Sequence, residues 1–155
     1  FDLADPFAVE RYRDDFLDLV RDDVDIVFAN ATEAQILYGT ENAEDSARAL
    51  GEHVRVAALK VGKEGSIVVQ HEASTRALRI TAVPGRPLAV VDTTGAGDMY
   101  SAGFLAALAT ERDAITAAHA AGWLAEAVIQ QIGAQFSVEK IRELRAEMDA
   151  AIYAE

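Results

Sequence analysis

Short apolar runs alternate with amphipathic stretches along most of the chain. Runs rich in Val, Ile, Leu and Ala have the length of buried strands and predict strands at residues 24–30, 54–61, 66–70, 77–83 and 88–92. Apolar residues at helical spacing predict helices at residues 7–20, 30–39, 44–50, 98–109, 113–131 and 137–153. Asp5 followed by Pro6 is typical of a helix start. Residues 1–3 have the pattern of the last part of a strand.

The order of these elements predicts the fold class. Strands that alternate with helices indicate an α/β layered fold with a largely parallel central sheet. A tight turn at residues 62–65 is expected to pair the strand at 66–70 with the preceding one as a hairpin. Ligands bind such sheets beyond the carboxyl ends of the strands. We therefore expect the loops after residues 30, 61 and 92 to lie on one rim.

The composition narrows the class of protein. The 155 residues suffice for one domain with a core, and 51% apolar with 26% charged residues is typical of a soluble globular chain. A formal net charge of −12 argues against a nucleic-acid partner, because phosphate binding needs clustered Lys and Arg. The lack of cysteine excludes disulfides and thiol catalysis. No apolar run is long enough to span a membrane, so we expect no membrane partner and a cytoplasmic location. The chain lacks an initiator Met, and we expect it to be the later part of a longer protein.

A glycine-rich turn joins the last predicted strand to the helix that follows it. The backbone N–H groups of Gly95, Ala96 and Gly97 are suited to bind a developing phosphate charge at a helix N-terminus. Asp98, in the first turn of that helix, would accept the proton of a substrate hydroxyl. The alternative is a tight turn in which Asp98 serves only the helix start. The spacing fits neither the Walker A loop nor the dinucleotide-binding fingerprint.

Two further motifs follow the strands at 24–30 and 54–61. Asn30 and Glu33 have the spacing of a reciprocal helix cap, and the same oxygen-rich pair suits Mg²⁺ held through water. Gly62 and Gly65 allow close approach to a nucleotide, with Lys60 adding positive charge, but a plain hairpin turn explains both glycines equally well. The three histidines lack the spacing of metal ligands, which favours structural roles.

These motifs together resemble those of a known family. Residues 92–108, "DTTGAGDMYSAGFLAAL", resemble the C-terminal signature of the ribokinase-like (PfkB) carbohydrate and nucleoside kinases. The upstream "NATE" is similar to the family's Asn-x-x-Glu motif, and "LKVGKEGSIVV" to its nucleotide-contacting strand and turn. Residues 4–19 and 121–136 resemble bacterial adenosine kinase-type members. The three motifs stand in the family's order.

The resemblance implies a fold and an activity. It implies a three-layer ribokinase-like α/β fold, in which residues 1–155 are the C-terminal portion that binds ATP and carries the catalytic base. The family's N-terminal half and lid have no counterpart in the chain. The implied reaction is ATP-dependent phosphoryl transfer to a hydroxymethyl group of a ribose-containing acceptor, with adenosine first. A sugar kinase is the alternative acceptor class, and a non-catalytic nucleotide-binding module is the alternative of another class. The full-length protein is expected to be a monomer or homodimer.

The resemblance also implies roles for individual residues. Asp98 looks like the catalytic base, and Gly95, Ala96 and Gly97 look like the anion hole. The Mg²⁺ and phosphate pair would be Glu33 and Asn30, and a possible K⁺ site would involve Asp92 and Thr94. The residues expected to lie by the nucleotide are Asn30, Lys60, Gly62, Gly65, Gly97, His119 and Gly133. The chain departs from many relatives at Lys60, where they carry Thr.

Overall fold

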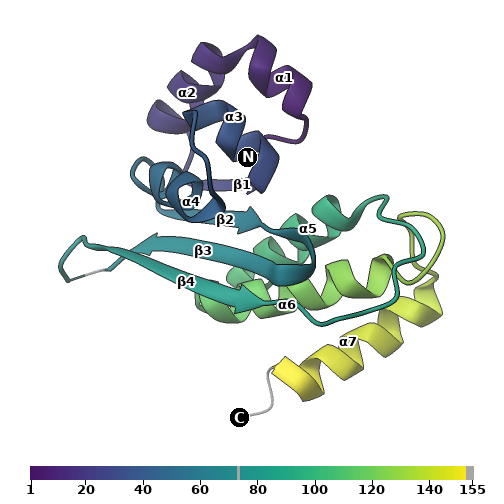
Figure 1. Cartoon of the computed structure of the whole chain (residues 1–155). Coiled ribbons are helices and arrows are strands. Elements are labelled where there is room, and N and C mark those ends of the chain that lie inside the picture. Colours follow the sequence, from purple (N-terminus) through teal and green to yellow (C-terminus); the bar gives the residue numbers. More distant parts are fainter. Residues whose placement is uncertain (73, 153–155) are drawn as a thin grey trace. The chain divides into compact units, whose positions relative to one another are not determined.

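The structure is a computed structural model that describes residues 1–72 and 74–152. It forms two compact units, Phe1–Gly85 and Arg86–Glu155. The first unit contains α1 (Pro6–Arg11), α2 (Arg13–Asp22), β1 (Ile26–Asn30), α3 (Ala31–Tyr38), α4 (Ala43–Gly51), β2 (Val56–Lys60), the 3₁₀ helix η1 (Gly62–Glu64), β3 (Gly65–His71) and β4 (Leu78–Pro84). The second unit contains α5 (Ala96–Ala109), α6 (Ala114–Val128) and α7 (Val138–Ile152) (Figure 1).

The sheet of the first unit is mixed. Its strand order is β1-β2-β3-β4, with β1 and β2 parallel and the β2–β3 and β3–β4 pairs antiparallel. Asp2 forms a parallel bridge with Phe28, so residues 1–3 pair with β1 as their pattern predicted. The predicted hairpin is confirmed. Within the described residues only β1, β2 and this bridge are parallel. Strands β3 and β4 each follow the preceding strand through a short connection, which makes each of them antiparallel to it.

Two helices bury the apolar side chains of this sheet. Helix α3 packs against β1 and β2, and α4 packs against β2, β3 and β4. Gly51, on α4, allows a close approach, since a Cβ atom there would overlap the side chain of Val69 on β3. The core of the unit includes the fully buried side chains Val27, Leu37, Leu50, Leu59 and Val69.

Several helices begin at side-chain caps, and two of these caps, Asp5 and Asn30, are as predicted. The side chains of Asp5, Asn30 and Asp113 accept N–H groups in the first turns of α1, α3 and α6. Such a cap stabilises a helix by about 1 kcal/mol, because it satisfies a donor that has no intrahelical acceptor. Gly39 ends α3 in the left-handed conformation, at φ 67°, as the predicted end near this residue requires.

The helix predicted at 7–20 is divided into α1 and α2. Tyr12 interrupts it with φ −118° and ψ 37°. The next residue, Arg13, donates from Nε to the carbonyl oxygen of Leu37 at 2.7 Å, at the end of α3. This tertiary contact lies where the apolar spacing alone predicts an unbroken helix.

In the second unit α5 packs closely on α6, and α7 contacts α6. A Cβ atom at Gly103 would lie 2.8 Å from Leu124 Cδ1 and 3.0 Å from Ala121 Cα, so the two helices approach each other where side chains are smallest. Phe104 and four alanines of α6 are fully buried in this unit. The predicted end of α7 near Tyr153 lies outside the described residues.

The prediction of a strand at residues 88–92 is wrong, since the structure describes these residues and they form no strand. Residues 86–92 are extended loop. Arg86 donates from its backbone N–H and from Nε to Glu126 on α6, at 2.8 and 2.6 Å. The N–H groups of Val91 and Asp92 donate to the carbonyl oxygen of Ile129, which caps α6. The N–H groups at the end of this apolar run are therefore bonded to the end of a helix and not to a neighbouring strand. None of the helices among residues 1–72 and 74–152 combines the length and apolar character needed to cross a membrane.

Candidate functional site

Asn30 and Glu33 form a complete reciprocal cap where β1 passes into α3. Asn30 Oδ1 accepts the N–H of Glu33 at 2.9 Å, and the N–H of Asn30 donates to Glu33 Oε2 at 2.8 Å. A third bond joins Asn30 Nδ2 to Glu33 Oε1 at 2.6 Å. The capping interpretation of this motif is thus confirmed, and both carboxylate oxygens are held by one asparagine.

Glu33 is a buried carboxylate, with only 2% of the residue exposed. Burial raises its pKa, an effect that the Asn30 N–H and the charge of Lys60 oppose. A carboxylate accepts about four hydrogen bonds, so two lone-pair positions remain for water. Among the described residues no group of three or more His, Asp or Glu side chains is arranged to hold a metal ion. Mg²⁺ that keeps several of its own waters needs only one or two carboxylates, and the remaining lone pairs of Glu33 are the positions that such waters would use.

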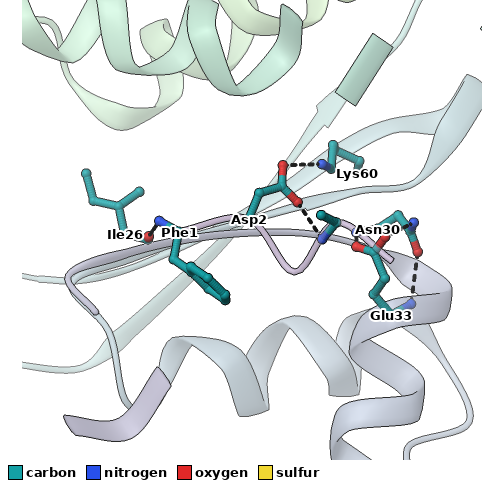
Figure 2. A network of polar contacts seen from close by, with 7 residues as sticks. Phe1, Asp2, Ile26, Asn30, Glu33 and Lys60 are labelled. Carbon is teal, nitrogen blue, oxygen red and sulfur yellow. Dashed lines mark hydrogen bonds and ion pairs between the residues drawn. The ribbon is translucent and has the colours of Figure 1, made fainter. Parts of the chain in front are cut away.

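Lys60 forms an ion pair with Asp2, a contact that the sequence did not reveal. Lys60 is the register partner of Asn30 on the neighbouring parallel strand, and its Nζ lies 2.9 Å from Asp2 Oδ2. Figure 2 shows this ion pair beside the Asn30–Glu33 cap. The side chains of Lys60 and Asp2 are 17% and 24% exposed. Lys60 thus stands at the end of β2 with its charge paired to Asp2, and its contact with a nucleotide stays a prediction.

Gly62 and Gly65 bound the short helix η1 after β2. Gly62 has φ 62° with open space where a Cβ atom would stand, so only its backbone conformation favours glycine. Gly65 has φ 100°, and a Cβ atom there would overlap the backbone of Val83 and Gly85. The backbone of the hairpin is by itself a sufficient reason for glycine at position 65.

The glycine turn of the second unit leads directly into α5. Gly95 is the N-cap residue in the left-handed conformation, at φ 78° and ψ 2°. The N–H of Ala96 donates to the carbonyl oxygen of Thr93 at 3.2 Å, which closes the turn. Asp98 is exposed in the first turn of α5. The predicted arrangement of a glycine turn, a helix N-terminus and an accessible carboxylate is present.

Asp92 connects this turn to the loop that follows α6. Its Oδ1 accepts the N–H and the hydroxyl of Thr94 at 2.9 and 2.7 Å, and its Oδ2 accepts the N–H of Gly133 at 2.9 Å. The Gly133 bond, followed by the two Thr94 bonds, lowers the pKa of Asp92. Three of about four acceptor positions are therefore used, which leaves one for the cation predicted at Asp92 and Thr94.

The predicted site residues fall into two groups. In the first unit Asn30, Glu33 and Lys60 lie together, and in the second unit Asp92, Thr94 and Gly133 lie together. His119 is exposed on α6, nine residues before its end at Val128, which corresponds to about 13 Å along the helix. His119 thus lies in the first half of α6, whereas Gly133 lies in the loop after the end of this helix.

Comparisons with known proteins show which family the chain matches and which solved structures it is similar to. Residues 2–141 match the model of the pfkB family carbohydrate kinases. A cytidine kinase of Thermococcus kodakarensis is 36% identical over 104 residues, which cover 65% of this chain and 36% of that protein. The adenosine kinase structure of Sinorhizobium meliloti has a TM-score of 0.83 at 38% identity, covering 94% of this chain and 43% of that one. The structure of a probable sugar kinase of Rhizobium etli has a TM-score of 0.82 at 33% identity, covering 95% and 44%. The fold expected from the sequence is confirmed, and the chain spans less than half the length of these relatives.

Proposed function

Because this chain belongs to the pfkB family of carbohydrate kinases, we propose that the protein containing it transfers a phosphoryl group from ATP to a ribose-containing acceptor. The reacting group is a hydroxymethyl group, and adenosine is the acceptor that we favour. The observation that carries the proposal is the turn in which Asp98 follows Gly95 at the start of α5.

Asp98 acts as the base in this proposal. Its carboxylate accepts the proton of the acceptor hydroxyl as the oxygen attacks the γ-phosphorus of ATP. A weak base suffices because phosphoryl transfer has a loose transition state, in which orientation counts for more than basicity. The N–H groups of Gly95 and Gly97, with the positive end of α5, stabilise the charge on the transferred group. Ala96 is also predicted for the anion hole, but its N–H donates to the carbonyl oxygen of Thr93, so in this structure Ala96 shapes the turn instead.

The first unit supplies groups for the nucleotide and its metal. Mg²⁺, when bound, would neutralise charge on the nucleotide phosphates. Glu33 would hold the ion through water, and Asn30 would face the phosphates. Lys60, Gly62 and Gly65 lie by the nucleotide. The loop that contains Gly133 and, more distantly, His119 border the adenine. A K⁺ ion at Asp92 and Thr94, and a cytoplasmic location, remain expectations from the resemblance.

Two alternatives differ in what they require. A sugar kinase uses the same base and turn, and the similarity to the probable sugar kinase of Rhizobium etli favours it as the second candidate. A nucleotide-binding module without activity needs no base. The exposed Asp98 directly behind the glycine turn therefore argues against that alternative.

The substitution Asp98→Asn tests the proposed base in the full-length protein. We expect turnover to fall by about 100-fold or more, with the affinity for ATP and the melting temperature nearly unchanged. The matched control is Asp14→Asn, because Asp14 is also exposed in the first turn of a helix, α2, but in the other unit. Its turnover should equal that of the wild type. An Asp98→Asn enzyme with near-normal turnover would show that another group takes the proton.

A further inference from the structure

We propose that Lys60 serves as a built-in cation that prevents a divalent metal ion from binding to Asp2 and Glu33 in the absence of nucleotide. Because Lys60 neutralises Asp2, the site takes its metal ion only together with the nucleotide phosphates. Lys60 thus determines when the metal ion binds, and it contacts no reacting atom in this role. The inference rests on the proposed function in one respect, the assignment of Glu33 to Mg²⁺.

The sheet brings these side chains together at the ends of its strands. Asp2 is the bridge partner of Phe28 on β1, and Lys60 on β2 is the register partner of Asn30. Residues two apart on a strand point to the same face, so Asp2, Asn30 and Lys60 share one face. Glu33 joins them through its three hydrogen bonds with Asn30. The carboxylates of Asp2 and Glu33 are therefore both carried to the end of β1.

The charges of these groups act on one another. Burial raises the pKa of Glu33, and the charges of Asp2 and Asp5 raise it further. The N–H of Asn30 and the charge of Lys60 lower that pKa. Lys60 Nζ lies 2.9 Å from Asp2 Oδ2, and both side chains are largely buried, so salt screens this pair less than a pair on the surface. Lys60 therefore cancels much of the negative charge that Asp2 would add to that of Glu33.

A turn holds Asp2 in place independently of Lys60. The N–H of Asp5 donates to the carbonyl oxygen of Leu3 at 2.8 Å, which closes a three-residue turn around Ala4. Ala4 has φ 65°, a left-handed conformation that costs a residue with a Cβ atom about 1 kcal/mol. Its N–H donates to Asp2 Oδ1 at 3.2 Å, and Figure 2 shows the Asp2 carboxylate pointing toward Lys60. The carboxylate should thus keep its position when Lys60 is replaced, while Oδ2 loses the ammonium group.

A divalent ion would take the place of the ammonium group if residue 60 were neutral. Mg²⁺ binds oxygen ligands and is usually held by one or two carboxylates together with substrate phosphates. With Lys60 charged, Glu33 is the carboxylate that remains for the ion, and binding needs the phosphates of the nucleotide. With a neutral residue at position 60, Asp2 and Glu33 together would hold the ion without those phosphates.

The substitution Lys60→Met tests this exclusion in the full-length protein, because methionine keeps an apolar chain and removes the charge. Mn²⁺ is titrated in the absence of nucleotide, and its electron paramagnetic resonance spectrum reports the free ion. We expect Mn²⁺ to bind the variant about tenfold or more tightly than the wild type. It should also raise the melting temperature of the variant alone, since it binds the folded state. Equal affinity for Mn²⁺ in the two proteins would overturn the proposal.

Lys63→Met is the matched control. Lys63 is exposed on η1, and its replacement changes the net charge by the same amount. This variant should bind Mn²⁺ as the wild type does, and a gain equal to that of Lys60→Met would overturn the proposal in favour of a general charge effect. Lys60→Arg keeps the charge and should still exclude Mn²⁺.

A double variant identifies the ligand. Asp2→Asn added to Lys60→Met should remove the gained affinity for Mn²⁺, because an amide replaces the second carboxylate. A double variant that keeps the gain would overturn the role of Asp2. If Lys60→Met does not fold, Lys60→Thr removes the same charge and takes its place in these titrations.

The titrations need no turnover, so they separate this inference from the proposed function. A gain of Mn²⁺ binding by Lys60→Met, in a protein that phosphorylates no acceptor, would refute the proposed function and leave this inference standing. An active kinase in which Lys60→Met gains no affinity for Mn²⁺ would overturn this inference alone.

Discussion

Tyr38 carries a buried hydroxyl oxygen that meets no hydrogen-bond partner among the described residues. Burial, with a smaller contribution from Glu52, raises its pKa to about 12. Tyr38→Phe should therefore increase the free energy of unfolding by about 1 kcal/mol, because it removes a buried polar group that gains nothing in return. The unfolded chain ionises near pH 10, before the folded chain does, so the wild type should lose stability as the pH rises from about 10 to 12. The variant should lack that loss.

Urea denaturation at about pH 8 and about pH 11 measures both effects. Tyr12→Phe is the control, because Tyr12 is 49% exposed. A Tyr38→Phe protein that is less stable than the wild type would show that the hydroxyl has a partner, such as an ordered water.

Single residues also show where sequence reasoning succeeds. The Asn30–Glu33 cap is predictable because its partners are three residues apart and the helix itself sets their geometry. The Asp2–Lys60 and Asp92–Gly133 contacts join residues 58 and 41 positions apart. Only the folded chain brings them together, so neither pairing could be predicted from local spacing.

At the scale of elements, the hairpin of β2 and β3 depends on its glycines to different degrees. Gly65→Ala should destabilise the protein by about 2 kcal/mol or more, because the new Cβ overlaps the backbone of β4 as well as requiring φ 100°. Gly62→Ala is the matched control. A Cβ atom at position 62 meets open space, so this variant should lose only the about 1 kcal/mol that its positive φ costs. Chemical denaturation of the two variants measures the difference. Equal losses would show that the hairpin can open at Gly65.

The helices and strands differ in how well their sequences predict them. Helices with a side-chain cap, such as α3 and α6, begin where the pattern places them. The run at 88–92 has the composition of a strand, but one carbonyl oxygen at the end of α6, that of Ile129, accepts the N–H groups of Val91 and Asp92. The helix at 7–20 is divided beside Arg13, whose partner is on α3. In both cases a tertiary hydrogen bond decides the local structure, and the spacing of apolar residues does not contain that information.

At the scale of the whole chain, a net charge of −12 opposes the binding of a polyanion such as ATP. Phosphate recognition must therefore be local. The start of α5 has backbone N–H groups and a positive dipole end, whereas the charge of Lys60 at the end of β2 is paired with Asp2. The family could be predicted from three short motifs because each motif is local in the sequence and they stand in the family's order. The acceptor could not be predicted in the same way, since Asp98 would contact only its reacting hydroxyl and the other assigned residues are not expected to contact it.

The acceptor is best decided by a screen of the full-length protein that scores ADP release. We expect release with adenosine first, then with other nucleosides such as cytidine, and least with ribose or fructose. The similarity to a cytidine kinase and to an adenosine kinase structure motivates this order. The Asp98→Asn protein is the control in every reaction, because it separates base-dependent transfer from slow hydrolysis of ATP. Release with a sugar but with no nucleoside would select the sugar-kinase alternative. ATP binding without release for any acceptor would select a nucleotide-binding module.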